Sequence, residues 1–380
     1  MRNPGRFWNR HKQSIVGDEG ARLESCASLL YGDEMRIGIA GLRRGQSYLK
    51  VFQERDDCQV TAICDTSPGL LKKMGDKWDI ASRLGSIDDL LVSEVEAIVI
   101  ATPGPNHAKQ AIAAVGAGYH VLSEVPAAWT LDECQQLVQA VERSDRVYML
   151  AENMCYFHYI TEWRSRIRNG EIGKITYAEA EYIHDCRDRM ATGNWRKDMP
   201  PMQYCTHSLG PVLDILEDRC VQAIGLSTGN QTSPEYEAAD LEVGLFTTEK
   251  GVTIKILCGF AVCRAPAFHW QVIYGTEGVI ENGRPPSDSA KIFRKGDPGM
   301  SEIAAEVTDP GVSEAVTSGH GNSEFLLCDD FLAAIRSDRP NPIDVYKAVE
   351  MSAPGICAHT SALSGGNPVS IPDYRSTKGS

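Results

Sequence analysis

Residues 35–45, with the sequence MRIGIAGLRRG, decide the fold of this chain. The first six of them predict a short buried strand, and a turn rich in glycine and arginine follows at once. A helix pattern comes next, and then a second apolar strand at 60–64 that ends on Asp65. A strand, a tight turn, a helix and a second strand in this order predict the first unit of a parallel α/β sheet.

The same stretch has the ingredients of a dinucleotide site. Such a site needs a tight turn, a helix N-terminus for the pyrophosphate, and an acid after the second strand for the ribose hydroxyls. Asp65 lies 20 residues after Gly45, where that acid belongs, and a carboxylate there repels a 2′-phosphate and favours NAD over NADP. The turn lacks the middle glycine of the G-x-G-x-x-G pattern, and its arginines either pair with phosphate or face solvent. We predict an NAD site built from Gly41, Leu42, Arg43, Arg44 and Asp65.

The pattern of the remaining chain changes near residue 152. Before that point apolar strands alternate with helices, at 97–101, 108–115, 120–122, 131–144 and 147–150. After it, a helix at 159–168 precedes longer strands at 174–183, 221–227, 241–247, 252–260 and 269–274, and helices follow at 322–336 and 345–363. We predict an extension over 1–34, a Rossmann domain with a parallel sheet over 35–152, and an α+β domain with a large, mostly antiparallel sheet over 153–380.

The composition argues against several classes of function. The net charge of −13 disfavours nucleic-acid binding, which needs a clustered basic surface. The chain has no run of 18 apolar residues that could span a membrane, and its first 34 residues lack the apolar centre of a signal peptide. The 12 cysteines include no CxxC pair and the nine histidines are dispersed, which indicates reduced thiols and no metal site. We expect a cytoplasmic protein that binds a small molecule.

Three further stretches carry a resemblance to a known family. They are Ala101-Thr102-Pro103 with Asn106-His107, then Gly118-Tyr119-His120-Val121 with Glu124-Val125-Pro126, then Glu152-Asn153. Their order resembles the Gfo/Idh/MocA family, the glucose–fructose oxidoreductase and inositol dehydrogenase group, over roughly residues 35–374. The resemblance implies that the Thr-Pro and Glu-x-Pro loops flank the nicotinamide end of the cofactor. It implies cofactor contacts from Thr102, Pro103, Asn106, His107, Glu124, Val125 and Asn153.

Two positions depart from the dehydrogenases of that family. Those enzymes usually carry Glu-Lys-Pro, whose lysine helps to move the alcohol proton, and Val125 stands in its place here. They also often carry an aspartate four residues before a histidine, and Gln203 stands four residues before His207. Oxidation of an alcohol releases a proton as well as a hydride, so the loss of both groups argues against an ordinary sugar dehydrogenase.

A second resemblance accounts for the departure. It is carried by the stretches 123–128 (SEVPAA), 152–156 (ENMCY), 182–185 (YIHD), 194–196 (NWR), 204–211 (YCTHSLGP) and 319–321 (GHG). These stretches resemble the NAD-dependent glycoside hydrolases of family 109, whose characterised members remove α-linked N-acetylgalactosamine. The resemblance implies transient oxidation at C3 of a sugar by NAD, removal of the C2 proton, loss of the group at C1, addition of water, and return of the hydride.

The second resemblance also implies roles for individual residues. Tyr156 would be the base at C2, with Tyr204 and His207 around the C3 hydroxyl. Trp195 and Arg196 would contact the cofactor, and His184, Arg187 and His320 the substrate. The residues themselves leave plainer readings open: a packed Tyr156, a helix cap for His207, a core position for Trp195, a turn for His184 and Asp185, and a linker for His320.

These observations leave three functions to compare. The first is glycosidic bond cleavage by transient oxidation, and the alternative is a conventional NAD-dependent sugar or cyclitol dehydrogenase in which His207 and Tyr204 replace the missing lysine. A non-enzymatic sensor on the same fold is disfavoured by Asp65 and by the titratable groups near the domain junction. The expected partner is a small carbohydrate, and the open antiparallel sheet predicts a homodimer or homotetramer.

Overall fold

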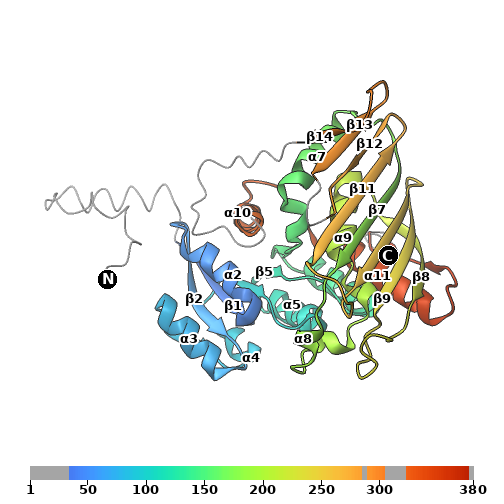
Figure 1. The fold of residues 1–380 in the computed structure, drawn as a ribbon. Coiled ribbons are helices and arrows are strands. Elements are labelled where there is room, and N and C mark those ends of the chain that lie inside the picture. The colour runs from blue at the N-terminus through green and yellow to red at the C-terminus, as the bar shows by residue number, and fades with distance from the viewer. Residues whose placement is uncertain (1–33, 285–288, 304–321, 376–380) are drawn as a thin grey trace, which may run out of the picture.

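The computed structural model describes residues 34–284, 289–303 and 322–375, which form two sheets with helices packed against them (Figure 1). The smaller sheet has six strands in the order β3-β2-β1-β4-β5-β6, and all of their pairings are parallel. The larger sheet has nine strands in the order β14-β13-β12-β11-β7-β10-β9-β8-β15. The predicted fold class, a Rossmann domain followed by an α+β domain, is confirmed.

The parallel sheet is built from the first half of the chain. Its strands are β1 (Met35–Ala40), β2 (Cys58–Cys64), β3 (Ser82–Leu84), β4 (Ala97–Ile100), β5 (His120–Ser123) and β6 (Tyr148–Leu150). The helices between them are α2 (Leu42–Gln53), α3 (Pro68–Trp78), α4 (Ile87–Leu90), η1 (Gly104–Asn106), α5 (His107–Gly116) and α6 (Leu131–Glu142). All four residues of β4 are buried, as a central strand covered on both faces requires.

The turn between β1 and α2 brings the backbone of α2 close to the sheet. Gly41 has a φ of 88°, in the left-handed region that favours glycine. A Cβ at this position would lie 2.4 Å from the carbonyl oxygen of Ala101, at the end of the neighbouring strand. The capping residue of α2 is Gly41, which has no side chain to bind the first N–H groups of the helix, and this end of α2 lies at the carboxyl ends of the strands. Gly41 therefore provides the tight turn of a dinucleotide site, although the sequence lacks the middle glycine of the usual pattern.

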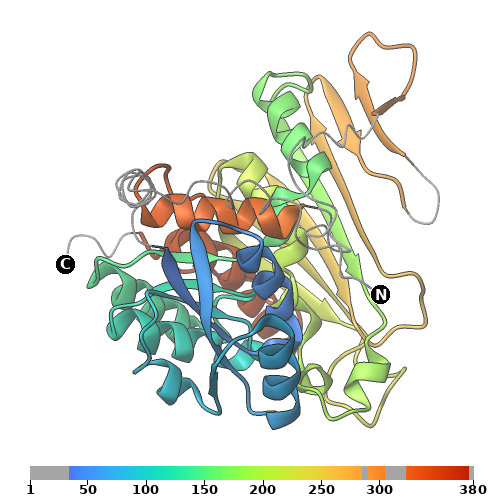
Figure 2. The same ribbon diagram turned by 90° about the vertical axis from the view of Figure 1, so that its left-hand side faces the viewer.

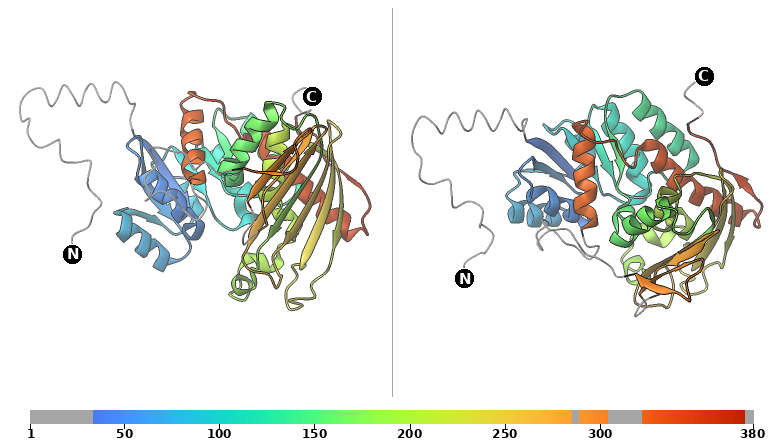
Figure 3. Two further views of the ribbon diagram at one scale, coloured as in Figure 1. Left: turned by 45° about the horizontal axis from the view of Figure 1, so that its top comes forward. Right: turned by 90° about the horizontal axis from the view of Figure 1, so that it is seen from above.

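The second sheet is mostly antiparallel, and its one parallel pair joins β7 to β10. Its strands are β7 (Ile175–Ile183), β8 (Cys220–Ser227), β9 (Leu241–Thr248), β10 (Thr253–Gly259), β11 (Phe268–Gly275), β12 (Gly278–Glu281), β13 (Ala290–Arg294), β14 (Ser301–Ile303) and β15 (Val369–Ser370). The sequence did not predict β12–β15 or β3, which are short strands with little alternation. Figure 3 shows helices on one broad face of this sheet and none on the other.

The helices and short turns of the second half lie between the two sheets or at their edges. They are η2 (Asn153–Tyr156), α7 (His158–Arg168), α8 (Arg187–Met190), η3 (Trp195–Asp198), η4 (Pro201–Tyr204), α9 (Thr206–Leu216), α10 (Ser323–Ile335) and α11 (Val345–Leu363). Figure 2 shows α10 lying across the parallel sheet, on the side of α2. Among the described residues, no helix combines the length and apolar character needed to cross a membrane.

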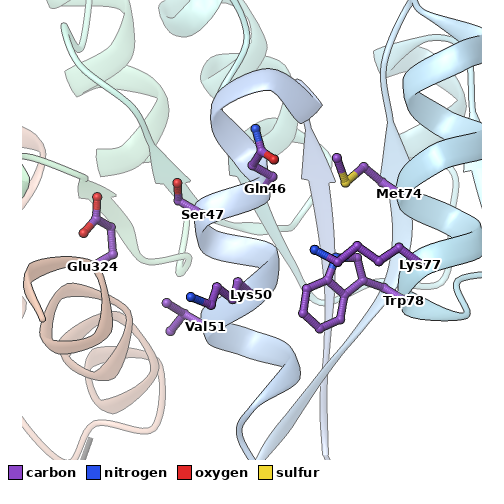
Figure 4. A pocket seen from close by; sticks show the side chains of 8 residues that line it. All are labelled: Gln46, Ser47, Lys50, Val51, Met74, Lys77, Trp78 and Glu324. Carbon is purple, nitrogen blue, oxygen red and sulfur yellow. The ribbon is translucent and has the colours of Figure 1, made fainter. Parts of the chain in front are cut away.

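Helix α10 completes the core of the N-terminal half. Leu327, Phe331 and Leu332 are fully buried in one cluster with Ile39 of β1 and Tyr48 of α2. The opposite face of the parallel sheet packs against α5 and α6. Figure 4 shows the edge of this arrangement, where Glu324 of α10 and Ser47 of α2 border a cavity of about 140 Å³ that reaches Trp78 of α3. The cofactor half of the molecule thus depends on a helix from the far end of the chain.

Replacement of Gly41 by alanine should destabilise the fold. The positive φ and the approach to Ala101 leave no room for a methyl group, so we expect a loss of about 1–3 kcal/mol in the free energy of unfolding. Chemical denaturation followed by tryptophan fluorescence measures this change. Gly85→Ala is the matched control, because nothing lies within 4 Å of a Cβ added there. Equal stability of the two variants would contradict the role of the turn.

Candidate active site

A first cleft of about 570 Å³ lies at the carboxyl ends of the parallel strands. Its lining brings together most of the residues predicted to bind the cofactor: Gly41, Arg43, Arg44, Asp65, Thr102, Pro103, His107, Glu124, Val125, Trp195 and Arg196. This edge of a parallel sheet is where dinucleotides bind in doubly wound folds. The first cleft therefore has the position and the donors that NAD requires.

Asp65 connects the two loops at the adenosine end of the first cleft. One carboxylate oxygen accepts the backbone N–H of Leu42 at 2.8 Å, and the other accepts that of Ser67 at 2.8 Å. The side chain of Leu42 is fully buried, so its contribution to the site is this backbone hydrogen bond. The carboxylate is thereby fixed beside the helix N-terminus, where it lines the cleft.

His107 holds together the two loops predicted to flank the nicotinamide. Its ring lies between the carbonyl oxygen of Pro126, 3.0 Å from Nδ1, and that of Thr102, 2.8 Å from Nε2. Burial lowers the pKa of His107, and the contacts with the two carbonyl oxygens oppose this effect. Asn106 is the last residue of η1 and does not line either cleft, so the structure does not support its predicted contact.

A second cleft of about 620 Å³ opens from the first toward the antiparallel sheet. The two clefts share Arg43, Arg44, Glu124, Thr192, Asn194, Arg196 and Tyr204, so they form one continuous channel. The second cleft adds Asn153 and Met154 from η2, Tyr182 and His184 from the end of β7, His207 from α9 and His269 from β11. Asn153 was predicted to contact the cofactor and lines only this second cleft.

Arg44 occupies the junction of the two clefts. Its guanidinium pairs with the buried carboxylates of Glu124, on the Glu-Val-Pro loop, and of Glu324, on α10, the latter at 3.1 Å. The hydroxyl of Tyr48 donates to Glu124 at 2.6 Å. Burial opposes ionisation of Glu124, but the charge of Arg44 together with the hydrogen bonds from Tyr48 and Arg44 outweighs it and lowers the pKa of this carboxyl. Val125, in the place of the usual lysine, is buried and supplies no charge.

His207 has a carboxylate partner that the sequence analysis did not identify. Its Nδ1 lies 2.7 Å from Oε1 of Glu152, and Glu152 is completely buried below the second cleft. The same oxygen accepts the N–H of Met154 at 3.1 Å, which fixes the carboxylate in place. With Nδ1 held by Glu152, Nε2 is the ring nitrogen left to exchange a proton with a ligand. The sequence held one signal of this partner, a glutamate that closely follows the end of a buried strand.

Aromatic rings form one wall of the second cleft. Tyr182 stacks on His269, with ring centroids 4.1 Å apart, and its hydroxyl lies 3.1 Å from Nδ1 of His184. The rings of Tyr204 and His207 meet edge to face at 5.4 Å. Burial raises the pKa of Tyr204, and the charge of Arg196 partly opposes this effect. Tyr182 and His269 were not predicted, because their pairing depends on the register of β7 and β11.

Two residues predicted for the site lie elsewhere. Tyr156 turns away from both clefts, and its hydroxyl donates to Asp330 of α10 at 2.9 Å. Burial and the neighbouring Asp330 raise the pKa of Tyr156 well above its usual range, so the predicted role as a base is corrected. Arg187 pairs with Asp185 at 2.7 Å and lines neither cleft. The arginine of the same short helix that does line the second cleft is Arg189.

The other predicted residues stay as predictions. His320 lies outside the described residues. The contacts expected of Tyr204, His207, His184, Trp195 and Arg196 fit their positions along the channel. Within the described part of the chain, no group of three histidine, cysteine or acidic side chains has the geometry of a metal site.

Comparison with known proteins finds a family match for two regions of the chain. Residues 35–152 match the family described as "Oxidoreductase family, NAD-binding Rossmann fold", Gfo/Idh/MocA. Residues 218–380 match "Glycosyl hydrolase 109, C-terminal domain". Proteins named glycosyl hydrolase family 109 protein from Shewanella pealeana and Solibacter usitatus are each 28% identical to this chain over 90% of its length, and cover 86% and 88% of their own.

Solved structures share the fold. An oxidoreductase from Agrobacterium radiobacter in complex with NAD⁺, L-tartaric acid and magnesium aligns with a TM-score of 0.76 at 18% identity, over 90% of this chain and 99% of the other. Myo-inositol 2-dehydrogenase from Lactobacillus plantarum aligns with a TM-score of 0.73 at 17% identity, over 90% of this chain and 100% of the other. Residues 35–152 are thus similar to the NAD-binding Rossmann domain of the Gfo/Idh/MocA oxidoreductase family, and residues 218–380 are similar to the C-terminal domain of glycosyl hydrolase 109.

Proposed function

We propose that this NAD-dependent enzyme cleaves a glycosidic bond by transient oxidation of the sugar at C3. The observation that carries the proposal is the buried Glu152 behind His207, at the wall of a cleft continuous with the cofactor cleft. Val125 and Gln203 stand where related dehydrogenases usually carry a lysine and an aspartate that help to move the proton. The pair of Glu152 and His207 supplies a proton acceptor in their place. The similarity to family 109 glycosyl hydrolases supports the reaction class.

The residues of the first cleft fit NAD. Asp65 stands where its carboxylate would accept hydrogen bonds from the hydroxyls of a ribose diol. Arg43 lines the cleft from the first turn of α2, and the N-terminus of this helix suits a pyrophosphate. When bound, NAD supplies a hydride acceptor at C3 and a hydride donor at the end of the reaction. The Thr102 and Val125 loops border the space next to the second cleft, where the nicotinamide belongs.

His207 is the proposed acceptor of the C3 hydroxyl proton. A carboxylate on Nδ1 orients the imidazole and stabilises the imidazolium that forms when Nε2 takes up the proton. Tyr204 lies beside it and offers a hydroxyl to the same oxygen. The ketone that results at C3 makes the C2 proton acidic, so a modest base is sufficient for the next step.

His184 is the proposed base at C2. It lines the second cleft, and burial together with the charges of Arg189 and Arg196 lowers the pKa of His184, so it is neutral and able to accept a proton near pH 7. Loss of the C2 proton expels the group at C1 and leaves an enone, to which water adds. Tyr156 does not meet the requirement, since its hydroxyl is bound to Asp330.

The proposal predicts cleavage without net reduction of the cofactor. Purified enzyme loaded with NAD should release phenol from an aryl glycoside while the absorbance of reduced nicotinamide at steady state stays low. The hydride returns to the same sugar in each turnover, which is the physical reason for this outcome. Accumulation of one reduced cofactor per sugar without release of phenol would instead indicate a conventional dehydrogenase.

Glu152→Gln should lower kcat by about 10²–10⁴-fold, because the amide no longer fixes the tautomer of His207 or stabilises its charged form. The affinity for NAD, measured by titration calorimetry, should stay the same. Glu162→Gln is the matched control, since Glu162 pairs with Arg166 on helix α7 and lines neither cleft. A Glu152→Gln enzyme as active as this control would rule out the proposed pair.

Exchange of the C2 proton separates His184 from Tyr156. In deuterated water, wild-type enzyme should incorporate deuterium at C2 of the released sugar, as measured by NMR. His184→Asn should lose this exchange, whereas Tyr156→Phe should keep it because its hydroxyl lies outside the cleft. The reverse result would return the role of base to Tyr156.

A further inference from the structure

We propose that the sugar bound in the second cleft carries an anionic substituent, a carboxylate or a sulfate ester, which Arg189 and Arg196 bind. The inference rests on the proposed function, because it takes the ligand of this cleft to be a sugar. It goes further by naming the chemical class of that sugar. Acidic residues outnumber basic ones in this chain, 51 to 38, so a local excess of arginine in one cleft is informative.

The two arginines reach the second cleft from neighbouring short elements, α8 and η3. The guanidinium of Arg196 is half-buried and rests over two rings, 4.5 Å from the centroid of Trp195 and 5.4 Å from that of Tyr204. These contacts hold its position and leave its N–H donors available, because a ring face accepts no strong hydrogen bond from them. Arg189 is exposed at the rim of the cleft.

Neither guanidinium is neutralised by a side chain of residues 34–284, 289–303 or 322–375. Neighbouring arginines differ in this respect: Arg187 pairs with Asp185, and Arg44 with Glu124 and Glu324. Asp188 also lines the cleft, but it is exposed and forms no ion pair with either arginine. The positive charge at this end of the channel therefore has no internal counter-charge in contact with it.

The two positive charges act on the same place. Helix α8 packs against η3, and Arg189 and Arg196 line the same cleft as His184. Besides burial, the charges of both arginines lower the pKa of His184. Arg43, in the first turn of α2, lines both clefts from the side of the glycine turn. Arg189 lines the second cleft and not the first, and Arg196 borders both, so these two are the pair that we assign to the substrate.

A carboxylate or sulfate satisfies this arrangement better than a hydroxyl does. The planar fork of arginine matches two oxygens of an oxyanion, and a charged hydrogen bond is about twice as strong as a neutral one. A neutral sugar would offer only neutral hydroxyl oxygens as acceptors to the same guanidinium donors. The cleft therefore selects for the charged member of a pair of otherwise identical sugars.

Matched pairs of p-nitrophenyl glycosides test the inference with NAD-loaded enzyme. Each neutral hexoside is compared with the corresponding uronide and 6-sulfated hexoside, in the gluco and galacto series and in both anomers. We expect an anionic member to exceed its neutral partner about tenfold or more in kcat/KM. A preference for the uronide indicates a carboxylate, and a preference for the sulfated hexoside indicates a sulfate ester.

Substitutions connect the preference to the two side chains. Arg189→Gln and Arg196→Gln should each reduce the anionic-over-neutral ratio by about tenfold, with KM for the anionic substrate rising. Affinity for NAD should stay the same in Arg189→Gln, and the ratio is measured at saturating NAD in Arg196→Gln because Arg196 also lines the first cleft. Arg168→Gln is the control, since it removes an exposed arginine, paired with Glu217, far from the cleft lining. Retention of the full ratio by both cleft variants would overturn the assignment.

A binding measurement separates this inference from the proposed function. Calorimetry of NAD-loaded protein with free glucuronate, galacturonate and the 6-sulfates, against glucose and galactose, reads the preference without any cleavage. Preferential binding of an anionic sugar with no glycoside cleaved would refute the proposed reaction and keep the inference. Cleavage or binding with no anionic member ahead of its neutral partner would refute the inference.

Discussion

The ion pairs of Arg44 hold together the region on which the rest of the site depends. One guanidinium joins the glycine turn after β1, the Glu-Val-Pro loop after β5, and the start of α10. Both carboxylates are buried, so each depends on Arg44 for compensation, and removal of one partner of such a pair typically costs about 3–5 kcal/mol. Three segments distant in sequence are thereby fixed around the point where the two clefts meet.

Helix α10 is part of the core of the N-terminal half, which its late position in the sequence does not indicate. The helix lies more than 150 residues after the last strand of the parallel sheet, yet it packs in the core with Ile39 and Tyr48 and contributes Glu324 to the junction. The division of the chain near residue 152 follows the change of pattern in the sequence. In space, the cofactor half is closed by a helix that the second half supplies.

The sequence was sufficient for the features that depend on local pattern. Buried strands, the position of Asp65 and the loops with Thr102 and Glu124 follow from periodicity and spacing, and the structure assembles them at one edge of the sheet. The sequence did not indicate in which direction each side chain points. A motif gives the order of residues but not which neighbour faces the cleft, so Arg187 was chosen where Arg189 lines it, and Tyr156 where Glu152 supports the site.

Pairing between β7 and β11 places Tyr182 directly opposite His269, and this register sets the stacked wall of the second cleft. A slip of one residue in either strand would turn one of the two rings to the other face of the sheet. The arginines, in contrast, stand on short helices between β7 and α9, outside the sheet. Under the proposed function, the wall of the reaction site stands on paired strands, whereas the arginines assigned to substrate preference stand on short helices outside the sheet. Exchange of that segment could then change the substrate preference without a change in the strands.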